Sequence, residues 1–135
     1  MMLGDLITLK QHRLPVKIVV FNNGALAFVE LEMKAAGLVN FGTDLDNPNF
    51  ADVATALGMH GQRVDRPDDL VGALRTAFSV DGPALVDVMT ARQELSMPPT
   101  ITLEQAKGFS LFMMKAVLSG RGDEIIDLAR VNLLR

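Results

Sequence analysis

The fold of this chain is decided by residues 14–36, LPVKIVVFNNGALAFVELEMKAA. The run VKIVVF at 16–21 is short and rich in β-branched residues, which is typical of a buried parallel strand. It stops at Asn22-Asn23-Gly24, where Asn and Gly tolerate the backbone angles of a tight turn. Apolar residues then recur with helical spacing at Leu26, Val29, Met33 and Ala36. The stretch predicts a strand, a polar loop and a helix, which is where open α/β sheets bind ligands.

Asn23 carries the first functional interpretation. Its side-chain amide oxygen and the neighbouring backbone carbonyls are hard, neutral ligands, which Mg²⁺ or Ca²⁺ accepts beside carboxylate and phosphate oxygens. Free N–H groups at the start of the following helix suit a phosphate. The alternative is that Asn22-Asn23-Gly24 only closes a turn, and the residues of this stretch leave both interpretations open.

The patterns in the rest of residues 1–90 favour an α/β fold. Helices are predicted over 3–13, over 50–58 with Asn49 as N-cap, and from Pro67 onward, and strands over 61–65 and 84–90. This order predicts a parallel sheet with helices on both faces. In the helix after Pro67, four residues are expected to face the core: Leu70, Leu74, Ala77 and Phe78. His60 is expected to lie on the surface, in the turn before a strand.

The segment after residue 90 is different in kind. Residues 91–101 contain Pro98-Pro99 and are predicted to form an extended connection, so we divide the chain into a domain at 1–101 and a helical tail at 102–135. Thr102 and Gln105 have the spacing of a capping box for a helix to about Ser119. Its apolar side is predicted to consist of Leu111, Met114, Val117 and Leu118.

A second tail helix is predicted from Asp123, as its cap, to about Leu134. It is amphipathic, with Ile125, Ile126, Leu128, Ala129 and Leu133 on one face. Two interpretations remain open: this helix docks on the domain that precedes it, or it lies at a lipid surface.

The composition excludes several classes of protein. The chain has 135 residues, 49% of them apolar, and a net charge of −3, which argues against disorder and nucleic-acid binding. The absence of cysteine excludes disulfides, a zinc knuckle and a thiol nucleophile, and two histidines are too few for a His-rich metal site. The first residues do not form a signal-peptide pattern, and no apolar run reaches the roughly 18 residues that span a bilayer.

Five segments together resemble the C-terminal part of bacterial pyruvate dehydrogenase (quinone), the pyruvate oxidase family of thiamin-diphosphate enzymes. They are VKIVVFNN, FVELEMKAAG, NFADVATALG, SVDGPALVDV and EQAKGFSLFMMKAVLSGRGDEIIDLA. The resemblance covers essentially all 135 residues. In that family the cofactor motif begins Gly-Asp-Gly and ends Asn-Asn. Met1 therefore looks like an internal position of a longer protein, with the motif aspartate just upstream.

The resemblance implies a set of site residues. Asn23 would offer its side-chain oxygen and Ala25 its backbone carbonyl to Mg²⁺, while Gly24 and Leu26 would offer backbone groups to the diphosphate. Phe28 and Val29 would face the thiazolium and the substrate, and Glu32 would lie near the pocket. Ala27 departs from the family, which commonly has glycine there.

The resemblance also implies a function. The full-length family converts pyruvate to acetate and CO₂ with thiamin diphosphate, Mg²⁺ and FAD, and passes electrons to a membrane quinone. The expected partners are pyruvate, quinone, membrane lipid through 120–135 and further copies of the chain, with no nucleic acid. The expected location is the cytoplasm, peripheral to the inner face of the cell membrane.

Several parts of that mechanism are not found in this sequence: the Gly-Asp-Gly aspartate, the glutamate that activates the cofactor, and the FAD domain. We therefore expect a fragment that is inactive alone. Two alternatives are a non-catalytic interaction module or split subunit that binds a partner, and a fragment of an acetolactate synthase-like enzyme. The tail after Pro99 argues against the second. A chain that lacks upstream strands should also have an unpaired sheet edge and tend to self-associate.

Overall fold

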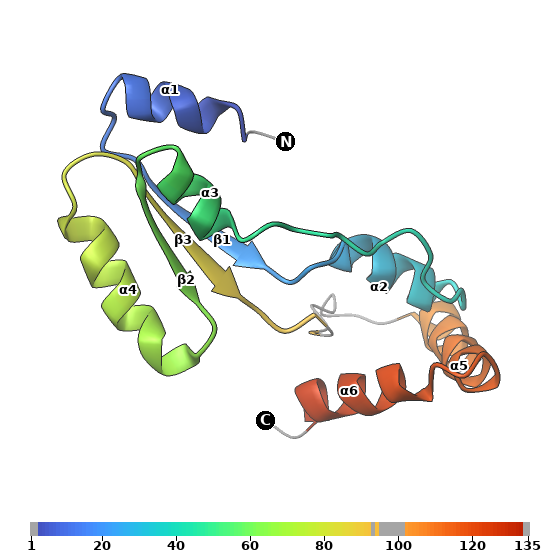
Figure 1. Ribbon diagram of the computed structural model, residues 1–135. Helices are drawn as coiled ribbons and strands as arrows, with labels where there is room; N and C mark the ends of the chain where they lie inside the picture. Colours follow the sequence, from blue (N-terminus) through green and yellow to red (C-terminus); the bar gives the residue numbers. More distant parts are fainter. Residues whose placement is uncertain (1–2, 93, 95–101, 134–135) are drawn as a thin grey trace. The chain divides into compact units, whose positions relative to one another are not determined.

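The chain forms two compact units in a computed structural model that describes residues 3–92, 94 and 102–133 (Figure 1). The first unit comprises Met1–Asn23 and Asp46–Thr90, and the second comprises Gly24–Leu45 and Ala91–Arg135. The predicted boundary at residue 101 and the Pro98-Pro99 connection lie outside the described residues. Each unit is described by itself below.

A three-stranded parallel sheet forms the centre of the first unit. Its strands are β1 (Lys17–Asn22), β2 (His60–Val64) and β3 (Ala84–Met89), in the order β1-β3-β2. Lys17 of β1 and His60 of β2 both pair with Ala84 of β3, so the three strands start at the same edge. The predicted α/β fold with a parallel sheet is confirmed. Among the described strands, β1 pairs with β3 alone, which leaves its outer edge unpaired.

Helices cover both faces of this sheet, as predicted. Helix α4 (Pro67–Ser79) packs on one face, where Ala73 and Ala77 lie against Val86 and its neighbours. Helices α1 (Asp5–Gln11) and α3 (Phe50–Ala56) cover the other face through a cluster that includes Leu6, Ala54 and Leu85. Because β3 is covered on both faces, its residues from Ala84 to Val88 are all buried, which explains its almost continuous apolar run.

Two expectations for the first unit were wrong. His60 is the first residue of β2 and half-buried, rather than a surface residue in a turn, because the strand begins one residue before the predicted start. Phe78 is largely exposed, because the side of α4 that meets the sheet is centred on Ala73 and Ala77, with Leu70 and Leu74 beside them, and Phe78 lies to one side of that stripe. The predicted N-cap is confirmed: Asn49 Oδ1 accepts the backbone N–H groups of Ala51 and Asp52.

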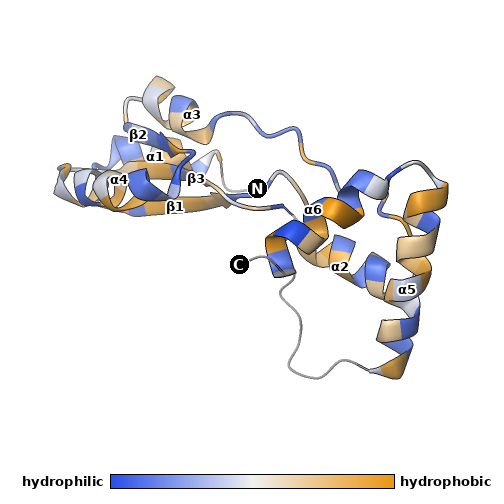
Figure 2. Cartoon of the chain, turned by 90° about the horizontal axis from the view of Figure 1, so that it is seen from below, coloured by the Kyte–Doolittle hydropathy of each residue, from blue (hydrophilic) through white to orange (hydrophobic). Residues whose placement is uncertain are grey.

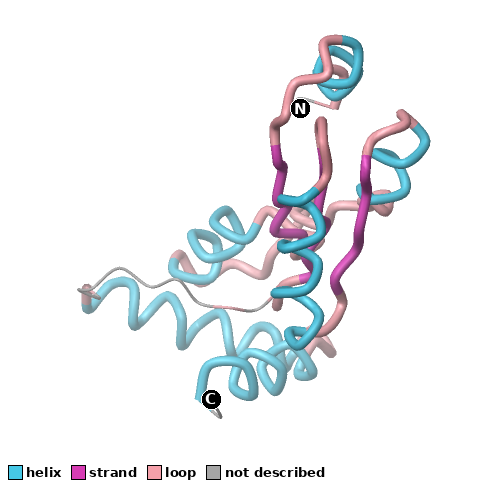
Figure 3. The backbone as a smooth tube through the Cα atoms, turned by 90° about the vertical axis from the view of Figure 1, so that its left-hand side faces the viewer, coloured by secondary structure: helices cyan, strands magenta, loops and turns pink. Residues whose placement is uncertain are grey.

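The second unit is helical. Helix α2 (Ala27–Ala35) packs on α5 (Leu103–Leu118), which leads into α6 (Gly122–Leu133); Figure 3 shows α5 and α6 as long runs of helix near the C-terminus. The buried residues of the tail are Phe112, Ala116 and Leu128. The predicted capping box of Thr102 and Gln105 is present at the start of α5. No helix in the described part of the chain is long and apolar enough to cross a membrane.

The predicted apolar side of α5 is not its buried side. Leu111, Met114, Val117 and Leu118 are all exposed, whereas α5 turns Phe112 and Ala116 inward. Much of α5 is apolar (Figure 2), so hydropathy alone does not select the docking side. Gly108 selects it, because a Cβ there would lie 1.8 Å from the carbonyl oxygen of Ala35 on α2. The predicted cap of α6 was also wrong: the helix begins at Gly122, and Asp123 lies in its first turn.

Candidate functional site

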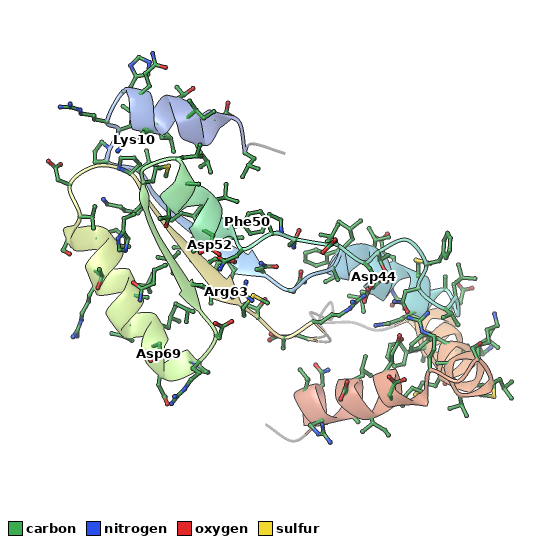
Figure 4. The ribbon with its side chains drawn as sticks, in the orientation of Figure 1. Lys10, Asp44, Phe50, Asp52, Arg63 and Asp69 are labelled. Carbon is green, nitrogen blue, oxygen red and sulfur yellow. The ribbon has the colours of Figure 1, made fainter. Side chains whose placement is uncertain are left out.

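A buried carboxylate lies on the central strand of the first unit, towards the carboxyl ends of the strands. Asp87 is 0% exposed in β3, and its Oδ1 accepts a hydrogen bond from Asn22 Nδ2 at 3.1 Å. Its Oδ2 accepts the backbone N–H of Phe50 at 3.1 Å and lies 3.5 Å from Arg63 Nη1. Figure 4 labels Phe50 at the start of α3 and Arg63 on β2. The carboxylate therefore joins β1, β2 and α3 to the middle of the sheet.

Asn22, the first residue of the predicted turn, is held by three hydrogen bonds. Its side-chain Nδ2 donates to Asp87, and its Oδ1 accepts from Asn47 Nδ2 at 3.0 Å. Its backbone carbonyl accepts the N–H of Thr90 at 3.0 Å. Asn22 is buried and Asn23, the next residue, is half-buried. Sequence reasoning missed Asp87, although a single acid within the apolar run of 84–89 was a signal that could have found it.

The predicted cofactor segment crosses from one unit to the other between Asn23 and Gly24. In the second unit, Ala25 is buried and forms an antiparallel bridge with Asp44. The bridge is flanked by hydrogen bonds from Leu45 N to Gly24 O at 3.0 Å and from Leu26 N to Thr43 O at 2.9 Å. Gly24 has a φ of +66°, in the left-handed region that favours glycine, and its Cα faces open space. A ligand can therefore approach the backbone here.

The start of α2 presents the residues predicted to line a pocket. Phe28 is 73% exposed, Val29 is 44% exposed, and Glu32 is also exposed. Leu26 is the N-cap and, among the described residues, no side chain caps this helix end; the same holds for α1 and α4, whereas Asn49 caps α3 and Thr102 caps α5. Uncapped N–H groups at a helix start suit an anion. The contacts of these residues with cofactor or substrate stay predictions.

The interior face of α2 is polar, which the helical stripe at Leu26, Val29, Met33 and Ala36 did not predict. Glu30 and Lys34 are the buried residues of this helix. Glu30 Oε1 accepts hydrogen bonds from Thr43 at 2.8 Å and Arg92 at 2.6 Å, and Arg92 also pairs with Asp44. We call Glu30, Lys34, Thr43, Asp44 and Arg92 the Glu30 network. Sequence reasoning missed it, since Glu30 and Lys34 have the i, i+4 spacing of an ordinary surface pair.

The charges of this network shift the titration of its members. Burial alone would raise the pKa of Glu30, but hydrogen bonds from Arg92 and Thr43 and the positive charges of Arg92 and Lys34 outweigh it, and the net pKa lies below its ordinary value. Burial lowers the pKa of Lys34, although Glu30 and Glu124 oppose this. Glu30 is therefore a carboxylate at neutral pH.

The donors in the predicted segment fit a hard divalent cation and a diphosphate in part. The Asn23 amide oxygen and the Ala25 carbonyl oxygen are the types of ligand that Mg²⁺ binds, and phosphate oxygens complete such sites. The described residues contain no group of three or more His, Cys, Asp or Glu side chains that could hold a metal ion.

A parallel sheet whose strand β1 ends at Asn22 and continues into helix α2 has the arrangement in which open α/β sheets place their ligand sites, at the carboxyl ends of the strands. Residues 1–88 match the family model of the thiamine pyrophosphate enzyme C-terminal domain, which binds that cofactor (also called thiamin diphosphate). Because this match covers more than half of the chain, the chain belongs to the thiamine pyrophosphate enzyme family.

Curated relatives support the same family. The chain is 34% identical over 130 residues to "Putative thiamine pyrophosphate-containing protein YdaP" of Bacillus subtilis (strain 168), covering 96% of this chain and 22% of YdaP. It is 37% identical over 86 residues to the acetolactate synthase isozyme 2 large subunit of Escherichia coli (strain K12), covering 62% of this chain and 16% of that protein. The mitochondrial acetolactate synthase of Schizosaccharomyces pombe is 32% identical over 95 residues, covering 70% of this chain and 14% of that protein. The chain thus spans about a fifth or less of the length of these relatives.

Proposed function

We propose that this chain supplies the part of a thiamin-diphosphate enzyme that holds Mg²⁺ and the diphosphate, and that the complete enzyme acts on a 2-oxo acid such as pyruvate. The observation that carries the proposal is the family match over 1–88. The matched residues include the Asn22-Asn23 pair at the end of β1 and all of the sheet apart from Met89. The open backbone at Gly24 and the uncapped start of α2 are consistent with a bound diphosphate.

The residues have separate tasks in this proposal. Asn23 offers its amide oxygen and Ala25 its carbonyl oxygen to Mg²⁺, and Gly24 and Leu26 offer backbone groups to the diphosphate. Thiamin diphosphate supplies the electron sink for the decarboxylation of the substrate. The exposed side chains at the start of α2 shield the reacting atoms from water: Phe28 and Val29, with Glu32 one turn further along.

For the reaction itself, an acetolactate synthase-like enzyme is the first candidate. Several of the curated relatives that match this chain carry that name, from bacteria, fungi and plants. These names agree with one of the alternatives from the sequence, a fragment of an acetolactate synthase-like enzyme. Over the first 90 residues, we give these relatives more weight than the resemblance to pyruvate oxidase.

A pyruvate:quinone oxidoreductase with FAD is the second candidate, and the exposed apolar surface of the tail favours it. Val117 and Leu118 of α5 are exposed and line an apolar hollow of about 520 Å³ together with Met113, Met114 and Ile125. An apolar surface of this kind is suited to a lipid interface, as expected for an enzyme that meets a membrane quinone.

Calorimetric titration of the chain with thiamin diphosphate and Mg²⁺ tests the main proposal. Binding that needs both components, and that Asn23→Ala weakens by at least about tenfold, is the expected result for the loss of one metal ligand. Asn132→Ala removes the same side chain from α6 and should leave the affinity unchanged. Equal binding by the two variants would rule out Asn23 as a ligand. No binding by the parent chain would rule out cofactor binding by this chain alone.

Sedimentation with phosphatidylcholine vesicles separates the two candidate reactions. The oxidoreductase proposal expects the chain to sediment with vesicles, and Leu118→Glu to abolish this, because a charge on the exposed apolar face opposes insertion. Val71→Glu places the same charge on an exposed residue of α4 and serves as the control. Absence of vesicle binding by the parent chain would leave the acetolactate synthase-like function as the remaining candidate.

A further inference from the structure

We propose that Asp87 is a positioning residue that sets the orientation of Asn23 by holding Asn22. The part of this inference in which Asn23 binds Mg²⁺ rests on the proposed function. The part in which Asp87 fixes the orientation of Asn23 concerns the chain alone. Asp87 and Asn22 are 65 residues apart in sequence, and their side chains meet within the first unit. Asn23 follows Asn22 directly, so whatever fixes the side chain and peptide of Asn22 also limits the directions that Asn23 can take.

The hydrogen bonds form a continuous chain from the sheet to the turn. Asp87 accepts from Asn22, Asn22 accepts from Asn47, and Asn22 also holds the N–H of Thr90 through its carbonyl oxygen. Both ends of the Asn22 amide are therefore occupied by protein groups. Asn22 itself is therefore not free to bind a ligand.

The chemistry of the donors requires a carboxylate at position 87. Three groups converge on this side chain, namely Asn22 Nδ2, the N–H of Phe50 and the guanidinium of Arg63, and all of them are donors. A carboxylate is a pure acceptor with two oxygens, so it can satisfy them all. An asparagine at 87 has one acceptor oxygen, and its NH₂ group would face another donor. Since the site is fully buried, water does not replace the lost bond.

The same count of donors and acceptors predicts a double variant that should restore the hydrogen bonds. In the exchange Asn22→Asp with Asp87→Asn, the new carboxylate at 22 accepts from the new amide at 87 and from Asn47. The oxygen of that amide accepts the N–H of Phe50. The exchange therefore keeps every hydrogen bond of the chain and leaves an oxygen beside Arg63. It removes only the negative charge of residue 87 from the ion pair with Arg63, which retains its ion pair with Asp65 at 2.9 Å. Asp87→Asn alone breaks at least one bond.

The test is ¹⁵N relaxation and hydrogen exchange on the labelled full chain without ligands. We expect Asp87→Asn to lower the order parameter of Asn23 from about 0.85 towards 0.6, and to speed exchange of the Thr90 amide at least about tenfold. The exchanged pair should restore both values. Val64→Ala, a destabilising control in the cluster under α4, should leave Asn23 rigid. An unchanged order parameter at Asn23 in Asp87→Asn would overturn the inference.

Two further measurements keep the inference decidable. If Asp87→Asn does not fold, Asn22→Ala takes its place, since it removes the linking amide and leaves Asp87 paired with Phe50 and Arg63; a rigid Asn23 there would equally overturn the inference. Calorimetry with Mg²⁺ and thiamin diphosphate should then show about tenfold weaker binding in Asp87→Asn and recovery in the exchanged pair. If the parent chain does not bind them, the proposed function fails, while the relaxation data still decide the role of Asp87.

Discussion

Glu30 and Lys34 lie one turn apart on α2, and both are buried, with exposed fractions of 2% and 3%. Glu30 Oε2 lies 3.6 Å from Lys34 Nζ, and the ammonium group lies 5.5 Å from the ring centre of Phe112 on α5. A pair with this spacing is ordinarily solvated. Here α5 packs over the pair, so the contact between α2 and the tail includes buried charges and the Phe112 ring beside the close approach of Gly108 to Ala35.

The Glu30 network predicts an asymmetric response to mutation. Glu30→Gln should lower the free energy of unfolding by about 3–5 kcal/mol, because Lys34 and Arg92 lose their buried counter-charge. Lys34→Met should lower it by less than about 1.5 kcal/mol, because Glu30 keeps Arg92 and Thr43 and the new side chain has similar volume. Urea unfolding curves measure both. Equal losses would mean that Lys34, rather than Arg92, is the main partner of Glu30.

The low pKa of Glu30 predicts a pH dependence of stability. A carboxylate whose pKa is lower in the folded chain contributes stability that is fully present above its ordinary value, 4.5, and is lost as the pH falls through the folded pKa. The difference in unfolding free energy between the parent chain and Glu30→Gln should therefore be constant from pH 7 to about 5 and shrink towards pH 3. Urea unfolding at these pH values measures it, and a constant difference down to pH 3 would contradict the assignment.

Gly108 predicts how the tail is attached to α2. Gly108→Ala places a methyl group 1.8 Å from the carbonyl oxygen of Ala35, so α5 must move away and the midpoint of unfolding should fall. Gly72→Ala is the matched control: it lies inside α4, its Cβ meets nothing within 4 Å, and it should stabilise the chain by about 0.5–1 kcal/mol. Circular dichroism measures both midpoints. A neutral Gly108→Ala would show that α5 does not dock this closely.

The free edge of the sheet predicts self-association. Val19 and Phe21 are exposed on β1, and Phe21 is 76% exposed. Phe21→Lys should reduce self-association, because a charge on an edge strand opposes pairing between sheets. Phe78→Lys makes the same change on α4 and controls for a general loss of hydrophobicity.

Light scattering measures this association and also bears on the alternative functions. Open-ended aggregation of the parent chain favours an enzyme fragment, and a defined dimer favours an interaction module. If Phe78→Lys reduces association as much as Phe21→Lys, the edge of β1 is not the contact.

Local patterns in the sequence determined the elements and several of their ends. Asn49, Thr102 and Gln105 cap helices through bonds to residues at most three positions away, so spacing alone predicts them. The α/β order followed from the same local periodicities, whereas β1 continues through Asn22, where the sequence had predicted the start of a turn. The cofactor residues Asn23 to Glu32 came from family resemblance, and their contacts stay predictions.

Tertiary structure decided which polar groups are buried and which apolar ones are not. Asp87 is 65 residues from Asn22 in sequence and Arg92 is 62 residues from Glu30, so no local spacing predicts either pair. The docking side of α5 was likewise set by the close approach of Gly108 to α2, since the helix offers apolar residues on its exposed side as well. Burial of a charge depends on partners that only the folded chain brings within hydrogen-bonding distance.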